Sequence, residues 1–188
     1  MKPNFYFQKI YDAEGKVCGI EILARDFHLC PYTDIYVFYS ALEEVQKLNL
    51  SVPAHINLYA SSIRYVRWDE IAREFGNKIV VEILETNVGT YVYDVEYLMS
   101  EGLLFALDDF GSGASNFSVL REVPFPIVKV DADLVPPGTA KSLKEELGVG
   151  KVIAEKTTSY PADAFQCFEL HVPEPLSVLK EVSVLKEE

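Results

Sequence analysis

Two adjacent carboxylates interrupt the middle of the chain, in the stretch LLFALDDFGSGASNF at residues 103–117. An apolar run leads into Asp108 and Asp109, and a loop of small residues that contains Gly111 follows them. Like charges placed side by side repel each other, most strongly where the dielectric constant is low. A lone carboxylate at a strand end is most often a helix cap or a solvated loop residue, and Asp109 also fits ordinary turn chemistry. The pair becomes informative only together with other residues.

Further polar side chains interrupt or end other apolar runs along the chain: Glu21, Asn57, Glu82, Lys129 with Asp131, Glu155, and Gln166 at the start of the last run. Parallel strands of a barrel converge with their carboxyl ends on one face, so we expect these groups to share one mouth. Five of the carboxylates gathered there cannot all stay ionised without a compensating cation: Glu21, Glu82, Asp108, Asp109 and Glu155. Carboxylate oxygens with the amide oxygen of Asn57 suit Mg²⁺ or Mn²⁺ rather than zinc. His55, on the same strand face as Asn57, either looks into this site or, as we favour, is a structural histidine.

Composition limits the classes of protein that this chain can belong to. Its 188 residues are 49% hydrophobic, which predicts one compact domain over residues 1–188. A net charge of −12 argues against binding to a nucleic-acid polymer. Three well-separated cysteines, without CxxC spacing, indicate neither a disulfide framework nor a zinc site. No run approaches the roughly 18 apolar residues that a membrane span needs, so we expect a cytoplasmic protein with no membrane partner.

The hydrophobic pattern predicts an antiparallel hairpin followed by alternating helices and strands. The hairpin pairs residues 5–12 with 16–24. Helices are expected over 34–49, 67–76, 91–102, 116–122, 139–148 and about 175–187, and strands over 53–58, 78–84, 103–108, 125–131, 151–155 and 166–170. Continuous apolar strands are typical of parallel sheets covered on both faces. The pattern predicts an α/β fold, a modified (β/α)8 TIM-like barrel. Because such barrels typically need about 250 residues, some helices must be abbreviated or missing.

Seven segments of the chain match, in order, the motifs of the EAL family, the cyclic di-GMP phosphodiesterase domains of bacterial signalling. The first, EILAR, resembles the E-x-L signature with its arginine, and ALDDFGSGASNF resembles the D-D-F-G-T-G loop. The other matching segments are INLYA, VEILET, VKVD, VIAEKTT and QCFEL. The resemblance implies a (β/α)8 barrel whose first strand is antiparallel.

The resemblance also implies a role for each matching residue. Two divalent ions, Mg²⁺ or Mn²⁺, are expected: Glu21, Asn57, Glu82 and Asp108 hold the first, and Asp108 with Asp109 holds the second. Lys129 positions the attacking water, and Glu155 is the candidate general base for opening cyclic di-GMP to linear pGpG. Residues at nucleotide-contacting positions are Gln8, Leu23, Arg25, Asp131 and Gln166. Glu85 braces the DDFGSG loop, through which relatives form a homodimer.

The chain departs from the family pattern in length and at several positions. The interval from Lys129 to Glu155 is shorter by roughly ten residues, close to one average helix. Within the motifs, the substituted positions are Asp26, Leu84, Lys156, Thr158 and Cys167; Lys156 and Cys167 each replace a glycine. These departures leave a second hypothesis open, a catalytically inactive EAL-like module that binds cyclic di-GMP or a protein partner.

Overall fold

The structure, a computed structural model, describes residues 2–26, 31–84, 88–112 and 117–179. It opens with an antiparallel hairpin of β1 (Asn4–Asp12) and β2 (Val17–Arg25), which confirms the predicted hairpin. β2 continues past Glu21 to Arg25, because Arg25 pairs with Asn4 at the start of β1. Glu21 therefore lies within its strand and not, as the sequence suggested, near the strand's end.

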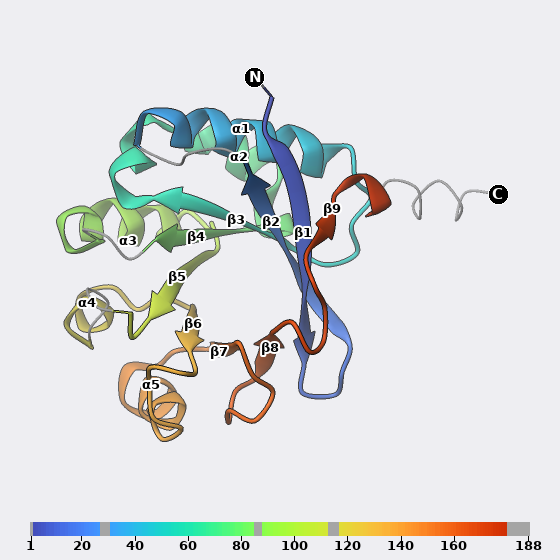
Figure 1. Cartoon of the computed structure of the whole chain (residues 1–188). Helices are drawn as coiled ribbons and strands as arrows, with labels where there is room; N and C mark the ends of the chain where they lie inside the picture. Colours follow the sequence, from blue (N-terminus) through green and yellow to red (C-terminus); the bar gives the residue numbers. More distant parts are fainter. Residues whose placement is uncertain (1, 27–30, 85–87, 113–116, 180–188) are drawn as a thin grey trace.

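Six more strands run parallel to β2 and form the wall of a barrel (Figure 1): β3 (Ala54–Tyr59), β4 (Ile79–Leu84), β5 (Phe105–Phe110), β6 (Ile127–Asp131), β7 (Lys151–Glu155) and β8 (Ala164–Gln166). β8 pairs with β1, which is antiparallel to it and to β2, so the sheet closes. A short strand, β9 (Glu174–Pro175), is added to β1. The predicted fold, a modified (β/α)8 barrel with an antiparallel first strand, is confirmed.

The helices lie outside the strands and are short (Figure 1): α1 (Pro31–Gln46), α2 (Trp68–Glu74), α3 (Val92–Ser100), α4 (Phe117–Glu122) and α5 (Thr139–Leu147), with 3-10 turns η1 (Ala60–Tyr65), η2 (Gly76–Lys78) and η3 (Val88–Tyr91). Residues 156–163 join β7 to β8 without a helix. Asp163 fastens this connection, because its carboxylate accepts the Val152 N–H at 2.8 Å and its N–H donates to Val152 O at 2.9 Å. The expectation of abbreviated or missing helices is confirmed.

Two groups of apolar side chains surround the polar part of the barrel. The larger packs the outer strand faces against the helices, where Trp68 stands between Phe38 and Phe105 with ring centroids 6.0 and 5.6 Å away. The smaller group, Ile10, Ile153 and Ala164, packs together within β1, β7 and β8. Ile153 and Ala164 each precede the polar residue of their strand by two positions, so they share its face of the sheet. The polar residues are thus held on a closely packed base.

The end of the chain differs from the sequence prediction. Gln166 is the last residue of β8 and not the first of a strand, because Cys167 O accepts the N–H groups of Leu170 and His171 and turns the chain away. Pro175, expected to start the final helix, lies in β9 beside β1. The helix expected over about 175–187 falls largely on residues 180–188, outside the described residues. Over the part of the chain that the structure describes, no helix is long and apolar enough to cross a membrane.

Candidate active site

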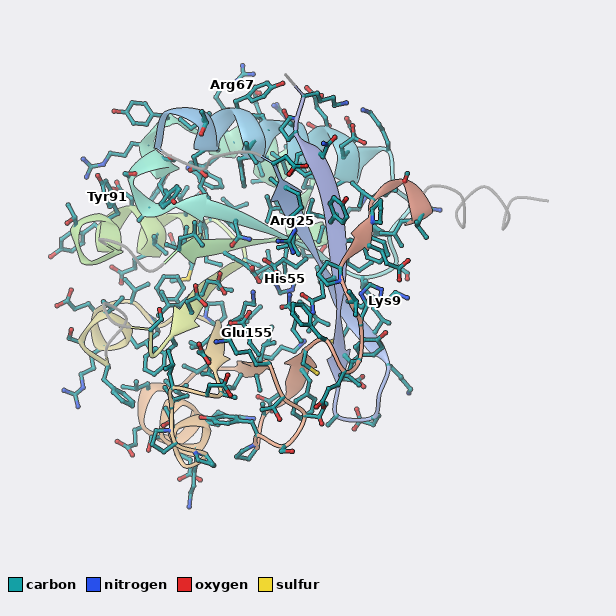
Figure 2. The ribbon with its side chains drawn as sticks, viewed as in Figure 1. Lys9, Arg25, His55, Arg67, Tyr91 and Glu155 are labelled. Carbon is teal, nitrogen blue, oxygen red and sulfur yellow. The ribbon has the colours of Figure 1, made fainter. Side chains whose placement is uncertain are left out.

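Most of the predicted polar residues are buried, and His55 and Glu155 lie within the ring of strands in Figure 2. The strand register sets Gln8 beside Glu21, Asn57 beside Glu82, and Glu155 between Asp131 and Gln166. Alternation along each strand then directs all of these side chains to the same face. The expectation that strand-borne polar groups meet at one mouth is met by the geometry.

Lys129 lies at the centre of this group, with a side chain only 1% exposed. Its Nζ contacts four carboxylate oxygens, at 3.0 Å from Glu82 and from Asp108, 3.2 Å from Glu155 and 3.3 Å from Glu21. Burial alone lowers the pKa of an ammonium group, but the four carboxylates raise the pKa of Lys129 well above its usual value. A buried cation of the protein's own therefore offsets the repulsion that the sequence predicted.

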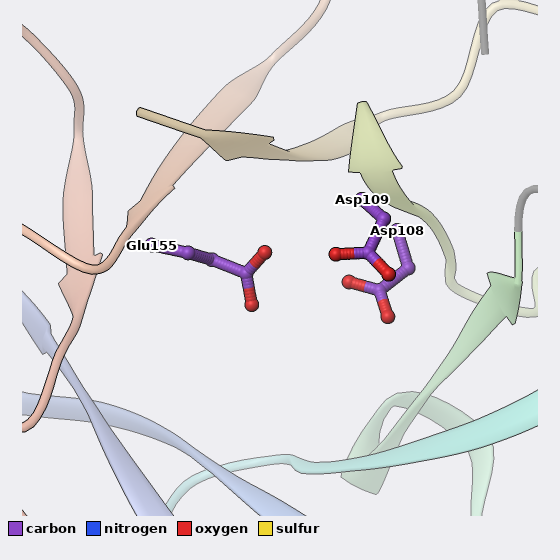
Figure 3. A group of neighbouring side chains, drawn as sticks. All are labelled: Asp108, Asp109 and Glu155. Carbon is purple, nitrogen blue, oxygen red and sulfur yellow. The ribbon is translucent and has the colours of Figure 1, made fainter. Parts of the chain in front are cut away.

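The two adjacent aspartates both reach the mouth because β5 is irregular there. Neighbouring residues of a regular strand point to opposite faces. The pairing of β5 with β6 shifts register between Leu107 and Phe110, and Asp109 adopts a left-handed backbone with φ 51°. Such a bulge redirects a side chain. As a result, oxygens of Asp108, Asp109 and Glu155 lie within 4.8 Å of one another, facing each other across the mouth (Figure 3).

Asn57 supplies an independent indication that a cation fits here. Its Nδ2 donates to Glu21 Oε1 at 2.7 Å. Its Oδ1 is buried and has no hydrogen-bond partner among the described residues. Mg²⁺ and Mn²⁺ prefer oxygen ligands, and this unpaired amide oxygen together with the surrounding carboxylates provides them. The residues present therefore fit a hard divalent ion.

The carboxyl groups differ in how readily they lose a proton. Burial is the main cause that raises the pKa of Glu155, to about 7 despite the attraction of Lys129. Burial likewise raises the pKa of Asp108, and it raises that of Glu82 well above the usual value. Burial also opposes ionisation of Glu21, but Lys129 with hydrogen bonds from Gln166 and Asn57 lowers its pKa overall. The protonation state of Glu155 therefore changes near neutral pH.

His55 borders the site as a structural residue, the interpretation that the sequence favoured. Its Nδ1 lies 2.7 Å from Glu82 Oε1, and its side chain is 3% exposed. Burial and the nearby Lys129 lower the pKa of His55 to about 3, so the ring is neutral. Gly19 makes room for it, because a Cβ atom there would lie 3.0 Å from His55 Nε2. His55 thus holds the Glu82 carboxyl group in place.

The predicted nucleotide-contacting residues take three different positions. Gln8 and Gln166 are buried and joined, since Gln166 Nε2 donates to Gln8 Oε1 at 3.3 Å and also to Glu21 Oε2. Asp131 is buried, and its Oδ1 accepts the Asp133 N–H at 3.0 Å. Leu23 is half-buried and Arg25 exposed near the end of β2. Glu85 lies outside the described residues.

A cavity of about 240 Å³ opens beside these carboxylates, lined by Gln8, Asp109, Glu155, Lys156, Gln166, Cys167 and Phe168. Sequence reasoning gave no site role to Lys156 or Phe168. The substitution of a glycine by Lys156, directly after Glu155, was the available signal; Phe168 is an exposed aromatic two residues after Gln166. A larger cavity of about 450 Å³ lies between the start of β1 and β9 and includes none of the predicted site residues.

Comparison with known sequences identifies one family and one curated relative. The family model described as EAL domain matches residues 22–147. The cyclic di-GMP phosphodiesterase PdeF of Escherichia coli (strain K12) is 24% identical over 199 residues, covering 88% of this chain and 27% of PdeF. The chain thus spans about a quarter of the length of this relative.

Several solved structures share the fold. The EAL domain of Mycobacterium smegmatis DcpA superposes with a TM-score of 0.77 at 20% identity, over 96% of this chain and 97% of that one. An EAL domain protein of Listeria monocytogenes superposes with a TM-score of 0.76 at 20% identity, over 98% of this chain and 93% of that one. Klebsiella pneumoniae BlrP1, in a complex with calcium and cyclic di-GMP, superposes with a TM-score of 0.76 at 21% identity, over 93% of this chain and 58% of BlrP1. At these identities the likeness shows the barrel fold.

Proposed function

Because the chain belongs to the EAL domain family, we propose that it is a metal-dependent phosphodiesterase that hydrolyses cyclic di-GMP to linear pGpG. The observation that carries the proposal is the convergence of Asp108, Asp109 and Glu155 within 4.8 Å at the barrel mouth. The orphaned Oδ1 of Asn57 supports it independently. Lys129 supplies one positive charge among four carboxylates, so a bound cation would offset the remaining negative charge.

We assign the ion ligands from the resemblance of their segments to the EAL motifs, which residues 22–147 match. Glu21, Asn57, Glu82 and Asp108 would hold one Mg²⁺ or Mn²⁺ ion, and Asp108 with Asp109 a second. Such ions would supply the Lewis-acid chemistry that acidifies a water molecule and stabilises negative charge on the phosphoryl group.

Two residues of the chain act on the reacting groups. Glu155, which faces Asp108 and Asp109 across the mouth, accepts the proton of the attacking water as the water oxygen bonds to phosphorus. The phosphorus–oxygen bond to the ribose breaks, and the leaving oxygen takes up a proton from solvent. Lys129 keeps four carboxylates in one arrangement, positions the attacking water and offsets the negative charge that develops on the phosphate.

Nucleotide binding is assigned to Gln8, Leu23, Arg25, Asp131 and Gln166. Gln8 and Gln166 line the cavity beside Glu155, so they stand where a ligand bound at the carboxylates extends. A homodimer through the loop that begins at Asp108 stays a prediction, as does the bracing of that loop by Glu85, because residues 85–87 and 113–116 lie outside the described residues.

Turnover of cyclic di-GMP tests the proposal directly. The purified protein is incubated with the substrate and Mg²⁺ or Mn²⁺, and the formation of pGpG is followed by chromatography. Glu21→Ala should abolish turnover through loss of metal binding. Glu145→Ala, which removes an exposed glutamate on α5, is the matched control and should leave turnover unchanged. Activity that survives Glu21→Ala would refute the ligand assignment.

One observation favours a second candidate, a non-catalytic module that binds cyclic di-GMP or a protein partner. Residues 156–163, between β7 and β8, form no helix, and Lys156, next to Glu155, has a left-handed backbone with φ 72°. The general base is therefore held by a short connection rather than by the usual strand–helix unit. If the protein binds cyclic di-GMP but forms no pGpG with either Mg²⁺ or Mn²⁺, the non-catalytic module is the correct function.

A further inference from the structure

Lys156 occupies a backbone conformation that disfavours its own side chain. Its φ is 72°, in the left-handed region where glycine is the preferred residue, and glycine is what the EAL pattern has at this position. The Lys156 N–H donates to Gln166 O at 3.0 Å, which holds the residue against β8. A glycine would meet the backbone requirement without strain, so the side chain itself needs a function.

The Lys156 ammonium group is held at the mouth of the barrel by acidic partners. Its Nζ pairs with Asp131 Oδ2 at 2.5 Å and lies 3.9 Å from Asp133 Oδ2. The Asp131 side chain is 7% exposed, whereas that of Lys156 is 53% exposed. The hydrogen bond with Asp131 is the main cause that raises the pKa of Lys156, so the group is charged. Lys156 therefore presents a positive charge to solvent beside the catalytic carboxylates.

The cavity next to Glu155 has few means of attracting an anion. Asp109 and Glu155, which line it, are acidic, and the positive charge of the proposed ions would be used by the phosphate that reacts. Lys129, 1% exposed and in contact with four carboxylates, is enclosed by the site. Among the described residues that line this cavity, Lys156 is the only cation.

The cavity beside Glu155 is small for a cyclic dinucleotide. Its volume is about 240 Å³, below the roughly 300 Å³ at which ligand pockets usually begin. A cyclic dinucleotide therefore extends past the rim, where Lys156 and the exposed ring of Phe168 lie.

We propose that Lys156 is a substrate-binding residue, whose ammonium group leaves Asp131 to bind the phosphodiester of the cyclic dinucleotide that is not cleaved. This inference rests on the proposed function and adds a binding residue at a position where the EAL pattern has glycine. A contact to the phosphate that does not react stabilises the bound substrate and the transition state equally. Its loss therefore raises KM and leaves kcat unchanged.

Three substitutions separate this role from a structural one. Lys156→Gly and Lys156→Met both remove the charge, but only Lys156→Gly relieves the backbone. Each should raise the Kd for cyclic di-GMP and the KM by about fivefold to tenfold, with kcat within about twofold. The glycine variant should nevertheless melt at a higher temperature than the methionine variant. Lys156→Arg should retain most of the affinity.

A surface lysine provides the matched control. Lys144 on α5 pairs with Asp163 and does not line the cavity, so Lys144→Met makes the same change in net charge away from the site. Binding is measured by calorimetry with cyclic di-GMP and Ca²⁺, and kinetics with Mn²⁺. Unchanged Kd and KM in both neutral Lys156 variants, or an equal rise in Lys144→Met, would overturn the inference and leave the proposed function standing. No binding and no turnover by the unsubstituted chain would overturn both.

Discussion

Asp108 and Asp109 are neighbours in the sequence, yet both carboxylates face the barrel mouth, because β5 shifts register against β6 and Asp109 has φ 51°. Two like charges are thereby brought together at the expense of backbone strain. Strain of this kind persists where the surrounding structure enforces it, and it gathers at functional sites. The bulge at the end of β5 is thus the backbone feature that creates the proposed ion site.

Asp109→Gly should stabilise the metal-free protein and weaken metal binding. Glycine relieves the left-handed backbone and removes a charge beside Asp108, a gain of up to about 1 kcal/mol, or roughly 2–4 °C in Tm. Affinity for Mn²⁺ should fall at least about tenfold through loss of a ligand. Melting in a chelator and Mn²⁺ titration measure the two effects.

Asp26→Gly is the control for the Asp109 substitution, since Asp26 has φ 59° and does not belong to the close carboxylate group. It should give a similar gain in Tm with unchanged Mn²⁺ affinity. If Asp109→Gly bound Mn²⁺ as tightly as the parent chain, Asp109 would not be a ligand.

Lys129→Met should strongly destabilise the metal-free protein. The substitution leaves four buried carboxylates without their common cation, and breaking a buried pair typically costs about 3–5 kcal/mol. Urea unfolding in a chelator measures this loss. Saturating Mn²⁺ should restore part of it, because an ion bound only by the folded protein stabilises it.

The matched control for Lys129 is Lys144→Met, which breaks the half-exposed pair with Asp163. This change should cost less than about 1 kcal/mol and should not respond to Mn²⁺. A Lys129→Met protein as stable as the control variant would contradict the view that Lys129 balances the carboxylates.

Much of this site could be predicted from the sequence. Glu82 and Lys129 interrupt apolar strands, and a parallel barrel directs such positions to one face. The four contacts of Lys129 could not be predicted, because they depend on how the barrel closes between β1 and β8. The pairing of Lys156 with Asp131 is equally nonlocal, joining residues 25 positions apart. Hydrophobic patterning also placed the last strand too late, since it gives no sign that the chain leaves the sheet after Gln166.

Glu155 should make the stability of the metal-free protein depend on pH. Its pKa of about 7 in the folded protein exceeds the value near 4.5 expected when unfolded, so the folded state binds the proton more tightly. Its contribution is fully present below about pH 4.5 and is lost as pH rises to about 7, a change of roughly 3 kcal/mol.

Comparison with Glu155→Gln isolates this contribution. His55, with a pKa of about 3, acts in the opposite direction but is present in both proteins, so its effect cancels. The parent chain should lose stability relative to Glu155→Gln between about pH 4.5 and 7, as measured by urea unfolding in a chelator at several pH values. A difference that does not change with pH would show that Glu155 titrates normally.

Gly111→Ala should destabilise the protein through both strain and collision. Gly111 has φ 107°, and a Cβ atom there would lie 2.3 Å from Val135 Cγ1. We expect a loss of about 2–4 kcal/mol in the free energy of unfolding, measured in urea. Gly102→Ala is the control, because Gly102 has φ 89° but open space around the added atom, and should cost only about 1–2 kcal/mol.

The double variant Gly111→Ala/Val135→Ala should be more stable than the sum of its single changes predicts, since the collision is then relieved. Equal losses in the two alanine variants, with additive behaviour of the double variant, would show that Val135 does not restrict the loop after Asp109.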